Sequence, residues 1–384
     1  MAQAKKKQKQ PVKTDQHFPI VGLGASAGGL EAFKKLIKAI PENSGMAYVL
    51  VQHLDPSHQS VLPEILSRET NIPVHEISDN IPLAPNHIYI IPANKILTSV
   101  DGVLKLTARD KNIINLPIDI FFSSLAEVHS SYATGVVLSG TASDGTEGLK
   151  AIKANGGITI AQDPDSAAYA AMPQNAINAG VVDFVLPPEQ IPQQLLQTIR
   201  LYNNNYPHTD EDTLEKTDEN ILRQILLSVR QYGDVDFTYY KQTTLRRRIA
   251  RRLAINKIAN LSDYLVFLRN NKTELEYLFQ DLLITVTTCF RDPKIYEELC
   301  DHILPDLLRN KSDEDPVRMW IAGCATGQEA YSMGICLHEV AETRSKDIKV
   351  QIFASDISEN AIRKARAGVY SQADMQNVSE IKNQ

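Results

Sequence analysis

The sequence predicts an α/β fold with a doubly wound, mostly parallel sheet, then a small all-helical subdomain and the start of a second α/β fold of nucleotide-binding type. Three observations support this prediction. From Phe18 to about Tyr202, short apolar runs alternate with helical patterns. A polar stretch and a run of helices with short breaks follow, and a second pattern of strand, glycine loop and helix begins at Val317. Alternation of strands and helices is typical of parallel sheets.

Shifts in composition divide the chain. Residues 203–219 are polar, acidic and rich in turn formers, as linkers are. We therefore expect a disordered tail over 1–16, an α/β domain over 17–202, a linker over 203–219, a helical subdomain over 220–290 and a partial nucleotide-type domain over 291–384.

Composition and charge exclude several classes of protein. Of 384 residues, 43% are hydrophobic and 22% charged, and the net charge of −6 gives no general attraction to nucleic acid. No apolar run reaches membrane-spanning length, and no hydrophobic segment follows the basic N-terminus. The four cysteines form no C-x-x-C pair, which argues against a disulfide framework or a metal site. These features predict a cytoplasmic protein without membrane insertion, metal or nucleic-acid partner.

The elements expected in the first domain follow from periodicity. Expected strands are Phe18–Leu23, Ala47–Gln52, His87–Ile91, Gly135–Leu138, Gly157–Ile160 and Val182–Leu186. Expected helices are Gly29–Ile40, Gln59–Thr70, Ile118–His129, Gly145–Asn155 and Gln190–Leu201.

The stretch from Phe18 to Ile37 organises this domain. A glycine-dense turn joins its strand to its helix and places Ser26 among small residues. Such a turn exposes a hydroxyl, and the following helix start offers N–H groups to a developing anion, so Ser26 is a candidate nucleophile. Two alternatives stay open at this point: a phosphate or dinucleotide cradle, because Gly22 to Ala27 also fits G-x-G-x-x-G/A, and a turn without chemistry.

Two further polar residues follow candidate parallel strands. His53 comes directly after one strand, and Asp144 follows another through a glycine-rich turn. The carboxyl ends of parallel strands meet at one edge of a sheet, so Ser26, His53 and Asp144 could serve as nucleophile, base and orienting carboxylate. A structural role for His53, or helix capping by Asp144, is the alternative.

The segments Ile20 to Gly29, Val51-Gln-His-Leu54 and Leu138-Ser-Gly-Thr-Ala-Ser-Asp-Gly145 resemble the three active-site segments of CheB-type chemotaxis methylesterases. Leu83 to Pro92 and Gln162 to Pro173 also resemble that family. The resemblance covers nearly all of residues 18–200. It implies a two-component (phosphorelay) signalling enzyme that hydrolyses glutamyl methyl esters of methyl-accepting chemoreceptors, and can deamidate glutamines, without a cofactor.

By this resemblance the nucleophile is Ser26, the base His53 and the supporting acid Asp144. Backbone N–H groups of Ala27 and Thr141 would hold the oxyanion. The family often has threonine at Ala27 and methionine at Thr141. This sequence shows no receiver domain before the esterase segments, so control by phosphorylation within the chain is not expected.

One segment of the helical subdomain is strongly basic. Leu245-Arg-Arg-Arg-Ile-Ala-Arg-Arg-Leu253 places its apolar residues on one helical face and five arginines across the rest. A solvated face and a docking surface for an acidic protein partner are the two main interpretations. Contact with nucleic acid ranks last, because no aromatic platform or binding motif accompanies the arginines. The candidate docking residues are Arg246, Arg247, Arg248, Arg251 and Arg252.

The second α/β pattern has features of a nucleoside site. The expected strand Val317–Ala322 leads into Gly323-Cys-Ala-Thr-Gly327, and the next, Lys349–Ala354, leads to Asp356. Glycines allow close approach of a ligand, and an acidic residue after the second strand can bind ribose hydroxyls.

Residues 220–384 resemble CheR-type chemotaxis methyltransferases. The resemblance rests on Phe237 to Arg248, Ile284 to Pro293, Trp320 to Ser332, Ala354 to Ile357 and Lys364 to Tyr370. It implies S-adenosylmethionine as cofactor, with contacts from Thr285, Thr287, Arg291, Glu329 and Asp356. Because the sequence given ends after about two strands of that fold, we expect weak cofactor binding and little transferase activity.

The favoured function is therefore hydrolysis of glutamyl methyl esters. One alternative is a methyltransferase whose esterase half is only a scaffold. The other is a non-catalytic adaptor that docks to receptors.

Overall fold

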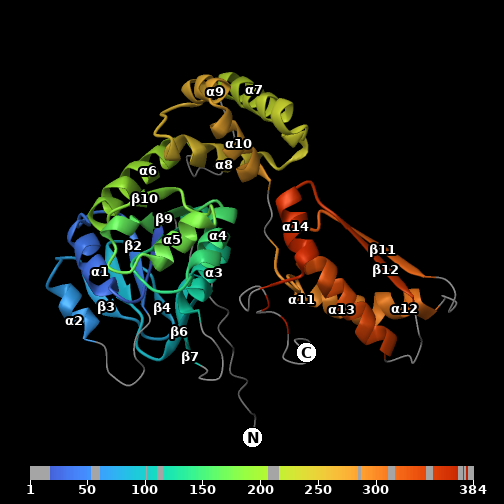
Figure 1. Ribbon diagram of the computed structural model, residues 1–384, viewed down its shortest axis with the longest axis horizontal. Helices are drawn as coiled ribbons and strands as arrows, with labels where there is room; N and C mark the ends of the chain where they lie inside the picture. Colours follow the sequence, from blue (N-terminus) through green and yellow to red (C-terminus); the bar gives the residue numbers. More distant parts are fainter. Residues whose placement is uncertain are drawn as a thin grey trace, which may run out of the picture. The chain divides into compact units, whose positions relative to one another are not determined.

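The computed structural model describes residues 18–52, 61–100, 102–109, 116–205, 216–283, 287–309, 316–342, 349–370, and the single residues 375 and 378. These residues form two compact units, divided between Leu282 and Leu283 (Figure 1).

The first unit contains a seven-stranded sheet in the order β10-β9-β8-β1-β2-β5-β3, in which every described pairing is parallel. Its strands are β1 (Ile20–Ala25), β2 (Ala47–Gln52), β3 (Val74–Glu76), β5 (His87–Ile90), β8 (Ala133–Val137), β9 (Ile158–Gln162) and β10 (Phe184–Leu186). The predicted doubly wound, mostly parallel sheet is confirmed.

Two groups of helices cover the two faces of this sheet. They are α1 (Gly29–Lys38), α2 (Leu62–Ser67), α3 (Pro117–His129), α4 (Thr146–Ala154), α5 (Ala171–Asn178) and α6 (Ile191–Asn205), with short 3₁₀ turns η1 (Ser130–Tyr132), η2 (Pro164–Ser166) and η3 (Pro188–Gln190). Helices α3, α4 and α5 pack on one face, and α1, α2 and α6 on the other.

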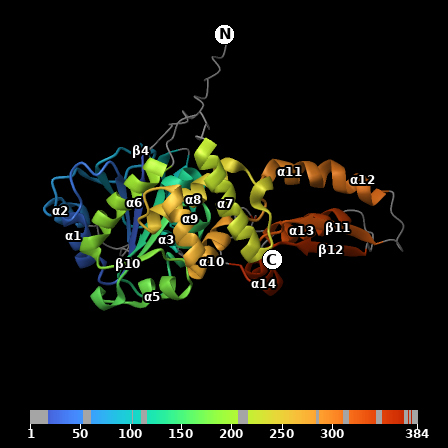
Figure 2. The same cartoon turned by 90° about the horizontal axis from the view of Figure 1, so that it is seen from above.

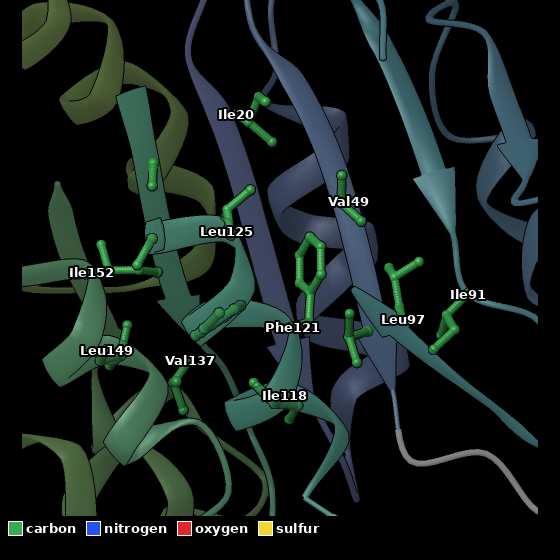
Figure 3. Packing of buried hydrophobic residues seen from close by; sticks show 14 of the residues in the cluster. Ile20, Val49, Ile91, Leu97, Ile118, Phe121, Leu125, Val137, Leu149 and Ile152 are labelled. Atoms are coloured by element: carbon green, nitrogen blue, oxygen red, sulfur yellow. The ribbon is translucent and has the colours of Figure 1, made fainter. Parts of the chain in front are cut away.

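Alternation along β1 explains how both faces become buried. Ile20 packs toward α3 (Figure 3), whereas its neighbour Val21 packs toward α1. Gly22 and Gly24 also face α3, where an added Cβ would lie 2.7 Å from Phe122 and 2.4 Å from Ile118. The two glycines therefore let α3 lie directly against the central strand.

A small antiparallel sheet, in the order β4-β7-β6, was not predicted from the sequence. Its strands are β4 (Ile81–Pro82), β6 (Lys95–Val100) and β7 (Val103–Ala108). Leu97 and Leu104 join it to the core beside α3.

His129, at the end of α3, forms a hydrogen bond with Ser99 of β6. The distance from Ser99 Oγ to His129 Nε2 is 3.0 Å. Burial lowers the pKa of His129 to about 4. This histidine is therefore neutral and structural near neutral pH.

The predicted helical subdomain completes the first unit. It consists of α7 (Lys216–Gly233), η4 (Phe237–Tyr239), α8 (Gln242–Ile255), α9 (Leu261–Asn270) and α10 (Lys272–Leu282). Helix α8 packs on α6, so this subdomain shares a boundary with the sheet domain (Figure 2). The helical turns continue further than expected: α6 and α7 extend into both ends of the expected linker.

The second unit has a two-stranded parallel sheet of β11 (Val317–Ala322) and β12 (Val350–Ser355). Its helices are α11 (Pro293–Glu298), a π-helical turn η5 (Leu299–Ile303), α12 (Leu304–Arg309), α13 (Gln328–Glu342) and α14 (Glu359–Ala367). None of the helices in the described ranges of either unit has the length and apolar character needed to cross a membrane.

Candidate active site

Ser26 lies at the point where the order of the large sheet reverses. Strand β1 pairs with β2 on one side and β8 on the other, so successive crossovers leave it in opposite directions. Ser26 directly follows β1, and the loop from Leu138 to Gly145 follows β8. Ligand sites of parallel α/β sheets form at such switch points, outside the carboxyl ends of the strands.

The turn at Ser26 is a strand-to-helix elbow, as predicted. The Ser26 N–H donates to the carbonyl of Ser139 (3.0 Å), and the Ser26 carbonyl accepts from Gly29 N–H (3.0 Å). Gly28 precedes α1 with φ 74°, a conformation that glycine adopts without strain. Ser26 is half-buried. Its backbone is thus fixed to the β8 loop, while part of the residue remains accessible.

Ser139 binds three segments together beneath this elbow. Its hydroxyl donates to the carbonyl of Ala27 (2.8 Å) and accepts from Tyr169 N–H (3.0 Å). Gly140 N–H donates to Tyr169 O (2.9 Å), and Met172 N–H donates to Gly140 O (3.0 Å).

Gly140 lies close to the elbow. A Cβ there would lie 2.0 Å from Met172 Sδ and 2.9 Å from Ser26 Cβ. The roles of Ser139, Gly140 and Tyr169 were not predicted from the sequence. The available signal was a small-residue loop after β8 together with the segment from Gln162 to Pro173.

Asp144 lies in the same loop and is buried, with 1% of its surface exposed. Its Oδ2 accepts from Ile118 N–H (3.1 Å) and its Oδ1 from Asp119 N–H (2.9 Å). Asp144 therefore caps α3 rather than α4, whose N-cap is Gly145 with φ 94°.

The predicted triad is only partly described. Ser26 and Asp144 follow neighbouring strands, β1 and β8, whereas His53 lies outside the described residues. Of the two predicted oxyanion donors, Ala27 is half-buried beside Ser139, and Thr141 is exposed directly after Gly140. The triad and the oxyanion site remain predictions.

The nucleoside-type loop of the second unit is held by Asp356. The carboxylate accepts from Ala325 N–H and from Ser358 N–H, both at 2.8 Å. Gly323 and Gly327 have φ of 72° and 95°. A cavity of about 580 Å³ opens beside the end of β12, lined by Ala354, Ser355, Asp356, Glu359, Ile362, Arg363 and Arg366.

The other predicted cofactor contacts lie around the start of α13, except Thr285, which is outside the described residues. Thr287 and Arg291 flank Phe290, whose N–H donates to Ser332 Oγ on α13 (3.0 Å). Glu329 is exposed in the first turn of α13. Burial, and secondly the Glu329 carboxylate, raises the pKa of Tyr296 to about 12. The ring of Tyr296 packs on that of Phe290, so these residues gather in one region.

The predicted docking face of five arginines needs correction, because three of them are buried on α8. Arg248 donates to the carbonyls of Lys153 (3.1 Å) and Ala154 at the end of α4. Arg252 bonds Glu274 on α10, Nε to Oε1, at 2.9 Å. Arg246 and Arg247 are only partly buried and stay candidates for contact with a partner.

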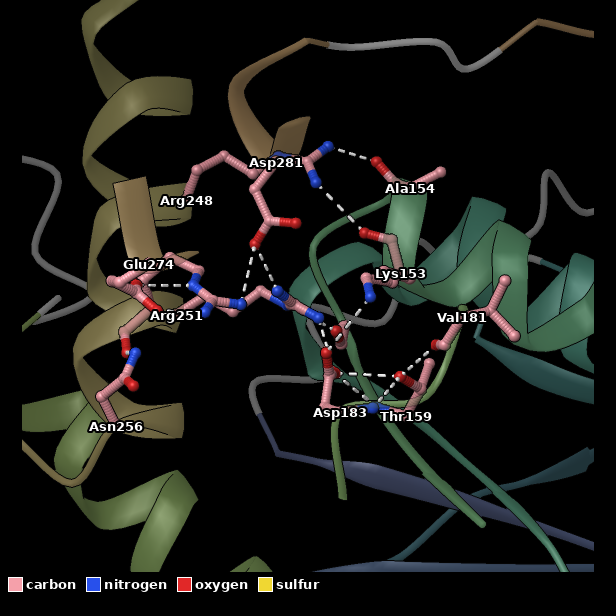
Figure 4. Close-up of polar contacts among 12 residues, drawn as sticks. Lys153, Ala154, Thr159, Val181, Asp183, Arg248, Arg251, Asn256, Glu274 and Asp281 are labelled. Atoms are coloured by element: carbon pink, nitrogen blue, oxygen red, sulfur yellow. Dashed lines mark hydrogen bonds and ion pairs between the residues drawn. The ribbon is translucent and has the colours of Figure 1, made fainter. Parts of the chain in front are cut away.

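Arg251 lies between the other two buried arginines along α8, and the three form the arginine cluster of this helix. Arg251 is fully buried (Figure 4). It pairs with Asp183 of the sheet domain at 2.5 Å and with Asp281 of α10 at 2.6 Å, and it donates to Gly157 O at 2.8 Å. Burial alone would lower the pKa of Arg251, but the two carboxylates raise it. The buried arginines of α8 therefore pair within the chain, with groups of the sheet domain and of α10.

A half-buried serine at the switch point of a parallel sheet, beside a loop with a buried aspartate, defines a candidate serine hydrolase of the three-layer α/β class. The comparisons identify the family. Residues 21–195 match the model described as "CheB methylesterase", residues 221–283 the "CheR methyltransferase, all-alpha domain", and residues 285–384 the "CheR methyltransferase, SAM binding domain". The chain belongs to the CheB methylesterase family and continues into CheR-type domains.

Named relatives agree with this assignment. The "Putative protein-glutamate methylesterase/protein-glutamine glutaminase" of Leptospira interrogans is 34% identical over 191 residues, which are 49% of this chain and 97% of that protein. The "Protein-glutamate methylesterase/protein-glutamine glutaminase" of Desulfotalea psychrophila is 33% identical over 190 residues, 48% of this chain and 52% of that protein.

A longer protein and a solved structure are also similar to this chain. An "Uncharacterized 104.1 kDa protein in hypE 3'region" of Rhodobacter capsulatus is 34% identical over 330 residues, 81% of this chain but 35% of that protein. This chain therefore spans about a third of that relative's length. The crystal structure of the Thermotoga maritima CheB methylesterase catalytic domain is 31% identical, covers 47% of this chain and 97% of that domain, and has a TM-score of 0.44.

Proposed function

We propose that the sheet domain hydrolyses γ-methyl esters of glutamate side chains on a chemoreceptor or a similar signalling protein. The observation that carries this proposal is the position of Ser26, on an elbow at the β1–β8 switch point, next to the loop that holds Asp144. The names of the Leptospira and Desulfotalea relatives support the ester and, for glutamine, the amide as substrates.

In the proposed mechanism Ser26 Oγ attacks the ester carbonyl carbon while its proton passes to the imidazole of His53. Asp144 orients that imidazole and stabilises its charged form. The negative oxygen of the tetrahedral intermediate accepts from the N–H groups of Ala27 and Thr141. The C–O bond then breaks, and methanol leaves with the proton from His53.

Water completes the cycle. His53 removes a proton from a water molecule that attacks the acyl-enzyme, and Ser26 leaves with that proton to give a free glutamate carboxylate. With a glutamine side chain the leaving group is ammonia. The proposal includes a cytoplasmic location, consistent with the four free cysteines.

The proposed function is tested with the full chain and a glutamate γ-methyl ester peptide. We expect methanol release, and we expect a fluorophosphonate probe to form one covalent adduct that peptide mass spectrometry places on Ser26, because such probes modify activated serines. An adduct on another serine, or no methanol release above the buffer rate, would contradict the proposal.

A second proposal concerns the CheR-type region. We propose that S-adenosylmethionine is its ligand, bound near Asp356 and Glu329, because Asp356 holds the glycine-rich loop at the end of β12. The match to the SAM-binding domain supports this.

We expect binding by this chain to be weak, with a dissociation constant above about 10 μM. In the described part of this unit β12 is largely exposed and pairs only with β11, so its sheet encloses little of a ligand. Isothermal titration of the full chain with S-adenosylmethionine measures this dissociation constant. Asp356→Ala is the control, and it should show no heat of binding. Binding at about 1 μM or tighter would contradict the expectation.

A further inference from the structure

Asp144 caps the start of α3, and Asp119 of α3 caps the start of α4. Asp144 accepts from the N–H groups of Ile118 and Asp119 in the first turn of α3. Asp119 in return accepts from Gly148 N–H in the first turn of α4 (2.7 Å). Each carboxylate thus satisfies helix N–H groups that have no partner within their own helix.

The two helices also approach closely at this point. A Cβ on Gly148 would lie 2.5 Å from Phe122 Cβ and 3.1 Å from Asp119 Cα. Glycine at this position therefore lets the first turn of α4 lie against α3, within hydrogen-bonding reach of Asp119. With 2% of its surface exposed, Asp119 has little access to water in place of these bonds.

We propose that Asp119 is a positioning residue of the esterase site, which acts through Asp144 by fixing the backbone that carries it. The inference rests on the proposed function, in which Asp144 orients His53. Asp144 lies in the loop directly before α4, whose first turn is held by Asp119 through Gly148 N–H, and the Asp144 carboxylate in turn accepts from Asp119 N–H. A shift of about 1 Å in an orienting group is enough to lower the rate of a catalysed reaction substantially.

Charge at this site supports the proposal. The pKa of Asp119 is raised to about 7, first by burial and then by the neighbouring carboxylates of Asp144 and, more weakly, Glu147. Backbone hydrogen bonds act in the opposite direction and lower it. Asp144 and Glu147 are the acidic groups of the described residues that act on it. Asp119 can therefore hold a proton near neutral pH, which limits repulsion of the catalytic carboxylate.

The test measures kcat and KM for the methyl ester in the full chain. Asp119→Ala removes the bond to Gly148 of α4, so we expect kcat to fall about tenfold or more while KM changes less than about twofold. Asp119→Asn keeps an acceptor oxygen and no charge, so at about pH 6 it should retain at least about a third of the wild-type kcat.

A matched variant distinguishes a positioning role of Asp119 from a purely structural one. Leu125→Ala, in the buried part of α3, should lower the melting temperature at least as much as Asp119→Ala, yet keep kcat within about threefold. If both variants lose kcat in proportion to stability, or if folded Asp119→Ala keeps full kcat, the proposal is wrong.

A second measurement does not depend on turnover. Since the folded pKa of Asp119 is raised from 3.8 to about 7, its contribution to stability is present below its ordinary pKa and is lost as the pH rises through about 7. Wild type should therefore lose melting temperature relative to Asp119→Asn between about pH 5 and pH 8.5. If the difference in melting temperature between wild type and Asp119→Asn does not change with pH, the charge at Asp119 plays no part and the charge argument is wrong. If the wild-type protein does not hydrolyse the ester, the proposed function is wrong, and this proposal with it.

Discussion

Replacing Ser26 with alanine is expected to reduce kcat/KM for glutamyl methyl esters by at least about 10³-fold. The variant loses the only atom that can form the proposed acyl-enzyme, while binding and oxyanion stabilisation keep some residual rate. Alanine fits the elbow, because Ser26 is fixed there by its backbone N–H and carbonyl. The fold should therefore survive, with a melting temperature within about 2 °C of wild type.

The measurement is methanol release from the ester peptide, with circular dichroism on the same samples. Ser67→Ala is the matched control, because Ser67 is an exposed serine at the end of α2. It should leave the rate unchanged. A Ser26→Ala protein that keeps more than about a tenth of the wild-type rate would remove Ser26 from the mechanism and favour a scaffold or adaptor role for this domain.

Replacing Arg251 with alanine is expected to lower the free energy of unfolding by about 3–5 kcal/mol. The change removes the cation that the buried carboxylates of Asp183 and Asp281 share. Only longer ion pairs remain, to Lys153 (3.7 Å) and Arg252 (3.8 Å), and buried charges that lose their close partner are strongly destabilising. Arg230→Ala is the matched control, because Arg230 pairs with Asp236 at 2.8 Å but is about half exposed. Its loss should cost about 1 kcal/mol or less.

Urea unfolding of the three proteins measures these differences. A further variant separates charge from packing: Arg251→Met with Asp183→Asn and Asp281→Asn removes all three charges together. It should be more stable than Arg251→Ala, since a buried ion pair adds little net stability over neutral groups. A loss below about 1 kcal/mol for Arg251→Ala would mean that water reaches this cluster.

The central sheet could be predicted because its signals are local. Strands β1, β2 and β8 are short apolar runs, and each is buried on both faces. The hairpin of β6 and β7 escaped prediction because its burial pattern is irregular and only a few of its side chains reach the core.

The role of the arginines could not be predicted for a different reason. Arginine is usually exposed, so a helix with five of them indicates a solvated or docking face. What buries Arg251 is a pair of carboxylates distant in sequence, Asp183 and Asp281, that the fold brings to it. The same holds for Asp144, whose capping partners on α3 lie far upstream in the chain.

The arginine cluster on α8 has a consequence for how this protein can be divided. The family matches separate at residues 195 and 221, which suggests independent modules. Yet a fragment that ends with α6 would expose the sheet-domain side of the cluster, with Asp183 stripped of Arg251 and the carbonyls of Lys153 and Ala154 stripped of Arg248. The esterase and the helices after it are therefore best handled as one folding unit, and evolution could exchange them for other domains only by rebuilding that shared surface.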